Sequence, residues 1–110
     1  MKTIIASACI GLGVLVQPTL AGPYVTVGPG AQSCGRWVKA NESSRVHGMS
    51  WVLGFMTAMN LRNSLNEANG NVTSGADTDS MELWLVNYCS GHPLDDLNEA
   101  TLQLYFELSK

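Results

Sequence analysis

The chain has 110 residues, of which 14% are charged, and a formal net charge of −3 at pH 7. This length allows one small domain. The acidic balance argues against a nucleic-acid partner, because binding to a phosphate backbone requires a basic stripe.

Residues 1–21 have the pattern of a secretory signal peptide. Lys2 gives a basic start, an uncharged stretch extends from Thr3 to Val16, and Ala21 offers a small residue for cleavage. A membrane anchor is the alternative, but the apolar run is shorter than the roughly 20 residues that span a bilayer. We therefore expect export to the periplasm, with no membrane attachment after cleavage.

Two cysteines, Cys34 and Cys89, follow the predicted cleavage point. Disulfides form in oxidising compartments, and two cysteines allow only one intramolecular pairing. Two free buried thiols are the alternative. We predict a Cys34–Cys89 disulfide that restricts the unfolded chain across a long loop.

Residues 22–32 are rich in proline and glycine and predict a loose N-terminal arm, with residues 33–110 forming the helical domain. Four β-formers at residues 24–27 could make an edge strand, but no partner strand is evident. Ser33 is a suitable N-cap for a short helix that begins at Cys34. Trp37 and Val38 share one face of this helix with Cys34.

Residues 45–65 predict the central helix, with Ser43 or Ser44 as its cap. Its middle, from Ser50 to Asn60, is the most apolar run after the leader, so we expect a helix buried on nearly every side. Gly54 and Ala58 are small and four residues apart. We expect them to form a notch against which another helix packs closely.

Residues 66–78 are rich in Asn, Gly and Ser and predict a loop. Asp79 and Glu82 then have the spacing of a capping box, and Asp96 and Glu99 repeat it before the last segment. Each box precedes a set of apolar residues at helical spacing. The chain therefore predicts an all-α fold, a small bundle of about four helices stapled by one disulfide.

The acidic side chains concentrate in residues 70–110, where Lys110 is the only basic residue. The two halves of the chain could simply pack with complementary charges. Alternatively, an acidic surface binds a basic partner. The candidate residues for that binding surface are Asp77, Asp79, Asp95 and Asp96.

Residues for catalysis or metal binding are sparse. His92 lies near Asp95 and Asp96, and Ser90 lies near His92, but a metal site or a nucleophile with an oriented base needs more convergent groups. Helix capping accounts for Asp77 and Asp79 better than a calcium loop does. We expect no catalytic residue, no metal and no cofactor, with a hydrolase or metal-binding protein as a weaker alternative.

Three motifs carry a family resemblance. They are Cys34-x-x-Trp37, Trp51-x-x-Gly54-Phe55, and Tyr88-Cys89-x-x-x-Pro93-x-x-x-Leu97-x-x-Ala100. Together they resemble the small periplasmic helical proteins of the HdeA type. They are also similar to periplasmic immunity proteins that neutralise type VI secretion amidase effectors.

The resemblance implies a non-enzymatic protein that acts by protein–protein contact and has a disulfide between Cys34 and Cys89. An acid-stress chaperone is the first expectation, and an immunity protein that inhibits a periplasmic toxin is the alternative. The partner would be an unfolded client or a toxin. A homodimer also remains open.

Overall fold

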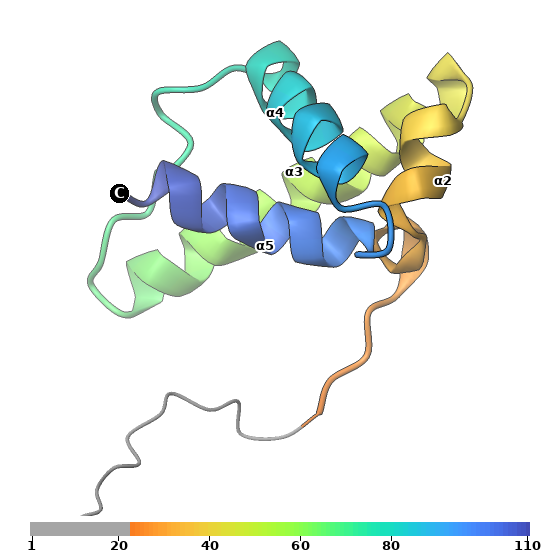
Figure 1. Ribbon diagram of the computed structural model, residues 1–110. Helices are drawn as coiled ribbons and strands as arrows, with labels where there is room; N and C mark the ends of the chain where they lie inside the picture. The colour runs from red at the N-terminus through yellow and green to blue at the C-terminus, as the bar shows by residue number, and fades with distance from the viewer. Residues whose placement is uncertain (1–22) are drawn as a thin grey trace, which may run out of the picture.

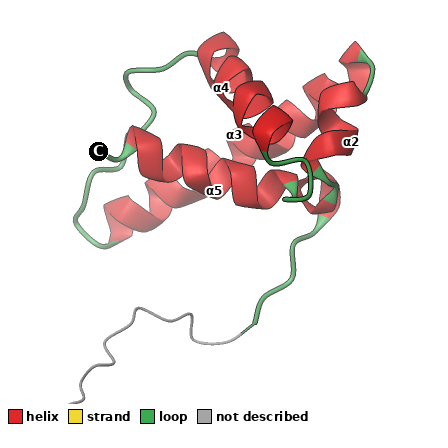
Figure 2. Ribbon diagram, in the orientation of Figure 1, coloured by secondary structure: helices red, strands yellow, loops and turns green. Residues whose placement is uncertain are grey.

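The computed structural model describes residues 23–110, so the predicted signal peptide lies outside the described part of the chain. The elements are the 3₁₀ helix η2 (Gly28–Ala31) and the α-helices α2 (Cys34–Lys39), α3 (Glu42–Leu65), α4 (Thr78–Gly91) and α5 (Leu97–Leu108). Helices account for all the regular structure between residues 23 and 110, and no β-strand forms there (Figure 2). The predicted all-α bundle of about four helices is confirmed.

The first two α-helices begin at short polar side chains. Ser33 caps α2 as predicted, because its Oγ accepts a hydrogen bond from the Arg36 amide at 3.2 Å. For α3, Asn41 is the cap, and its Oδ1 accepts from the Ser44 amide at 2.9 Å. The prediction of Ser43 or Ser44 was wrong because Asn41, just upstream of both serines, already accepts from one of the unpaired amides of the first turn.

Both later helices begin with a capping box. In α5 the predicted pair is confirmed: Asp96 accepts from the Glu99 amide at 2.7 Å, and Glu99 accepts from the Asp96 amide at 3.0 Å. In α4 the box is formed by Asp77 and Ser80, two residues before the predicted one. A serine replaces glutamate in the reciprocal contact, which leaves the side chain of Glu82 free for another role.

The core lies where α2, α4 and α5 meet α3. In Figure 1, α5 crosses in front of α3, and the end of α4 lies beside α2. The Cys34–Cys89 disulfide joins the first residue of α2 to the end of α4, as predicted. The largest fully buried side chains are Trp37, Leu85, Leu97, Leu104, Val52, Thr101, Cys34 and Cys89.

The central helix α3 is buried along one face only, so the expectation of burial on nearly every side was wrong. Gly48, Met49, Val52 and Met56 form its buried stripe. Gly54 and Ala58 point away from the core, and a Cβ built on Gly54 would meet no atom within 4 Å. Within residues 23–110, no helix combines the length and the apolar character that a membrane span requires.

The close approach that we expected at Gly54 occurs at Gly48 instead. A Cβ on Gly48 would overlap the indole of Trp37, and one on Gly30 would overlap the indole of Trp51. The rings of these two tryptophans therefore lie directly against backbone. Glycine is required there because no side chain fits between the helix and the ring.

Residues 22–32, which we expected to form a loose arm, are instead packed on the bundle where the structure describes them. Gly28–Ala31 form η2, which contacts α3 and α5. The segment before η2 contacts the bundle at two further points. Trp51 Nε1 donates to the carbonyl of Val27 at 2.8 Å, and Asn98 Nδ2 donates to Tyr24 Oη at 3.0 Å. The segment has no regular secondary structure. These contacts attach it to α3 and α5.

Candidate functional site

The four predicted acidic residues do not form one surface. Asp77 and Asp79 lie at the start of α4, whereas Asp95 and Asp96 follow its end. A helix of 14 residues separates them, a distance of about 20 Å at 1.5 Å per residue. We predicted one binding surface from these four acids, but the fold separates them into two pairs.

Two of the four acids are occupied as helix caps. Asp77 accepts from the Ser80 amide at 2.8 Å, and Asp96 accepts from the Glu99 amide at 2.7 Å. The hydrogen bond from the Ser80 amide, together with a contact to the Ser80 hydroxyl, holds the pKa of the Asp77 carboxyl below its ordinary value of 3.8. Both carboxylates serve the helix starts.

Asp95 accepts a hydrogen bond from Tyr88, which belongs to an aromatic stack at the end of α4. Tyr88 Oη donates to Asp95 Oδ2 at 2.6 Å, and this hydrogen bond, with some burial, raises the pKa of Tyr88 to about 12. The Tyr88 ring is stacked between His92, at 4.1 Å between centroids, and Trp84, at 5.6 Å. His92 Nδ1 also lies 2.9 Å from the Tyr88 carbonyl.

This arrangement fixes His92 in a structural position at the end of α4. Among residues 23–110, no hydrogen bond joins Ser90 to His92, and no group of three or more His, Cys, Asp or Glu side chains is placed to hold a metal ion. The residues that we considered for catalysis are thus not brought together. Their surroundings match a C-terminal helix cap.

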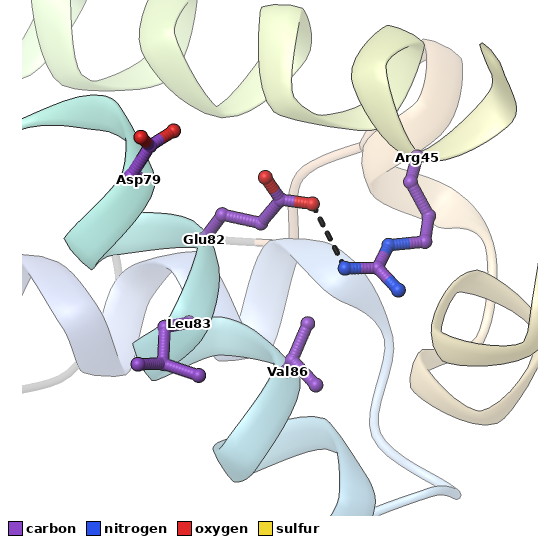
Figure 3. A pocket seen from close by; sticks show the side chains of 5 residues that line it. All are labelled: Arg45, Asp79, Glu82, Leu83 and Val86. Carbon is purple, nitrogen blue, oxygen red and sulfur yellow. Dashed lines mark hydrogen bonds and ion pairs between the residues drawn. The ribbon is translucent and has the colours of Figure 1, made fainter. Parts of the chain in front are cut away.

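Asp79 alone among the four faces a cleft between α3 and α4. An ion pair crosses this cleft: Arg45 Nη2 of α3 donates to Glu82 Oε2 of α4 at 2.9 Å (Figure 3). The two side chains keep 30% and 29% of their surface exposed, so the pair is accessible to solvent. The cleft thus has a charged centre that a partner can reach.

The ion pair borders two adjoining hollows. One has a volume of about 280 Å³ and is lined by Arg45, Asp79, Glu82, Leu83 and Val86. The other, of about 320 Å³, is lined by Ala40, Glu42, Arg45 and Glu82. Leu83 stays 61% exposed at the edge of the first hollow. We call these two hollows and their lining residues the α3–α4 cleft.

Arg45 is held from a second side. Its guanidinium carbon lies 5.6 Å from the centroid of the buried Trp37 ring, and its backbone carbonyl accepts from Trp37 Nε1 at 3.4 Å. Cation–π contact and ion pairing together orient the arginine toward Glu82. The cleft is therefore preorganised rather than dependent on a free side chain.

A second, smaller depression lies between α4 and α5. Its volume is about 170 Å³, and it is lined by Ala76, Ser80, Met81, Trp84, Leu104, Glu107 and Leu108. Of the three tryptophans, Trp37 is buried, while Trp51 and Trp84 are half-buried. Trp84 is thus the tryptophan that borders an apolar depression.

The pairing of Arg45 with Glu82 had no signal in the sequence. The two residues are 37 positions apart, on helices whose mutual orientation depends on the whole core. Leu83 falls outside the apolar stripe of α4. An apolar residue off that stripe is a sequence signal for exposed apolar surface on the helix.

Comparison of the chain with protein-family models, with curated proteins and with solved structures found no match.

Proposed function

We propose that this chain is a secreted, periplasmic, non-enzymatic protein that binds another protein through the α3–α4 cleft while it remains folded. The observation that carries the proposal is the ion pair at the centre of the cleft. Arg45 and Glu82 form a charged, solvent-accessible feature beside exposed apolar surface at Leu83. Arginine and apolar anchors next to a pocket are common features of protein interfaces.

An inhibitor of a secreted protein, such as a toxin, fits this proposal best. An inhibitor must offer a preformed surface, since rigid surfaces lose less entropy on binding. The Cys34–Cys89 bridge and the Asp77–Ser80 capping box hold α4 in place. Leu83 and Val86 are presented from this fixed helix.

Capture from a periplasmic extract with matched variants tests the proposal. Leu83→Ala removes the apolar side chain at the cleft without adding a charge, whereas Leu61→Ala makes the same change on the outer face of α3, where the leucine is 59% exposed. We expect Leu83→Ala to weaken the complex at least about ten-fold and Leu61→Ala to leave it unchanged. Equal binding by both variants would exclude the cleft as the contact surface.

An acid-stress chaperone of the HdeA type is the second candidate, supported by the acids at the helix starts. Because the pKa of Asp77 is lowered in the folded state, its stabilising contribution is present above the ordinary value of 3.8. It is lost as the pH falls through the lowered folded-state pKa.

The chaperone candidate predicts that acid loosens the bundle and exposes apolar surface. Far-UV circular dichroism and binding of a hydrophobic dye, followed from neutral pH to about pH 2, measure this directly. Increased dye binding with preserved helix content would support the chaperone. Unchanged signals over the whole pH range would exclude the chaperone candidate and favour a protein that binds its partner while folded.

A further inference from the structure

We propose that the hollow lined by Asp79, Glu82 and Leu83 receives one basic side chain, an arginine or a lysine, from the protein partner. This inference rests on the proposed function, because it assigns the chemistry of the group that enters the same cleft. Arg45 occupies part of that position in the free protein, through its ion pair with Glu82. The partner's cation would compete with Arg45 for Glu82.

Charge favours a cation in this position. The lining residues of the two hollows include three carboxylates, from Glu42, Asp79 and Glu82, against one guanidinium, from Arg45. No basic residue occurs in α4 itself. The carboxylates therefore exceed the cation within the cleft, and an incoming positive charge would reduce their mutual repulsion.

The apolar part of the hollow fits the stem of a basic side chain. Leu83 and Val86 lie one helical turn apart on α4, beside the carboxylates of Asp79 and Glu82. Arginine and lysine bury their methylene groups on apolar surface and keep the charged end among polar groups. An acidic or purely apolar side chain would satisfy only one of these two surfaces.

The hollow has a volume of about 280 Å³ and lies at the surface, where one long side chain of a protein partner can enter it. The several N–H donors of a guanidinium would suit two neighbouring carboxylates.

Two blocked tetrapeptides provide the probe, Ac-Gly-Leu-Arg-Gly-amide and the same peptide with Gln in place of Arg. Each is titrated into the ¹⁵N-labelled mature protein at low ionic strength, and the amide signals of residues 79–86 and of Arg45 are followed. We expect the Arg peptide to bind at least about five-fold more tightly than the Gln peptide.

Two variants locate the binding. Asp79→Asn removes one carboxylate at an exposed position, so it should weaken the Arg peptide about five-fold without affecting the fold. Arg45→Gln removes the competing cation and should strengthen binding of the Arg peptide. A variant that only loosened the structure would weaken binding, so an increase identifies Arg45 as the competitor. Circular dichroism verifies that both variants are folded.

Equal affinity for the Arg and Gln peptides, or no shift of the residue 79–86 signals with either, would overturn this inference. That result leaves the proposed function intact if Leu83→Ala still weakens partner capture. The proposed function itself fails if the partner complex is unchanged by Leu83→Ala.

Discussion

Gly48 and Gly54 lie in the same helix, and their surroundings are opposite. A Cβ on Gly48 would overlap the buried ring of Trp37, while one on Gly54 would be in open space. The sequence suggested a close approach at Gly54, because Gly54 is at the centre of the apolar run and forms a small-residue pair with Ala58. Spacing identifies small residues but does not establish which face of a helix meets the core.

These two glycines give opposite predictions for the same substitution. Gly48→Ala should destabilise the protein by about 1–3 kcal/mol through overpacking against Trp37. Gly54→Ala should stabilise it by up to about 1 kcal/mol, because alanine has the higher helix propensity. Urea unfolding of both variants measures the difference. A destabilised Gly54→Ala variant would show that the outer face of α3 is covered.

Tyr88 illustrates a residue whose chemistry depends on a contact made through the fold. Its hydroxyl donates to Asp95, and this hydrogen bond raises its pKa to about 12. Since the folded-state pKa is raised, the associated stability is complete below the ordinary value of 10.0. It is lost as the pH rises from there toward the folded-state pKa.

An ultraviolet absorbance titration of tyrosinate formation tests this contact. We expect the wild-type protein to contain one tyrosine that ionises near pH 12, and Asp95→Asn to lower that pKa toward the ordinary value. Asp79→Asn, at the other end of α4, is the control and should have no effect. An unchanged titration in Asp95→Asn would contradict the assigned hydrogen bond.

At the scale of the elements, the sequence was sufficient to predict which segments form helices. It predicted where a helix starts only if both residues of the capping box were evident. Asp96 and Glu99 form the predicted capping box because both partners have the side chains that this motif requires. For α4 the prediction was wrong by two residues. Asp77 and Asp79 both resemble caps in sequence, and Ser80 decides between them by completing the reciprocal contact with Asp77.

The cap of α5 should contribute measurably to stability. Replacing Asp96 with alanine removes the acceptor for the Glu99 amide and should cost about 1 kcal/mol, or about 4–8 °C in the thermal midpoint of a domain this small. Asp96→Asn keeps an acceptor and should recover most of the loss. Thermal unfolding followed by circular dichroism measures both. No loss in Asp96→Ala would mean that another group accepts the amide.

At the scale of the molecule, the disulfide is the predicted feature on which the fold most depends. Exported chains with two cysteines have one pairing available, and the structure places Cys34 and Cys89 with their Cα atoms 4.8 Å apart. The bridge closes a loop of 55 sequence positions. The α3–α4 cleft was not predictable, because it depends on the crossing of helices that are distant in sequence.

Loss of the disulfide should destabilise the chain by about 4 kcal/mol in the chain-entropy model. That is a large part of the roughly 5–15 kcal/mol that stabilises a native protein. The double variant Cys34→Ala/Cys89→Ala, compared with the oxidised and the chemically reduced wild type, measures the effect in urea. A double variant as stable as the oxidised protein would contradict the role of the bridge.

Folded-state binding at the α3–α4 cleft is the central claim, and site-specific photo-crosslinking at neutral pH tests it most directly. A photoreactive amino acid replaces Leu83 at the cleft or Leu61 on the outer face of α3, two positions of nearly equal exposure, 61% and 59%. We expect the same partner protein to be captured from position 83 and not from position 61. Capture from position 61 alone, or capture only after acidification, would contradict this claim.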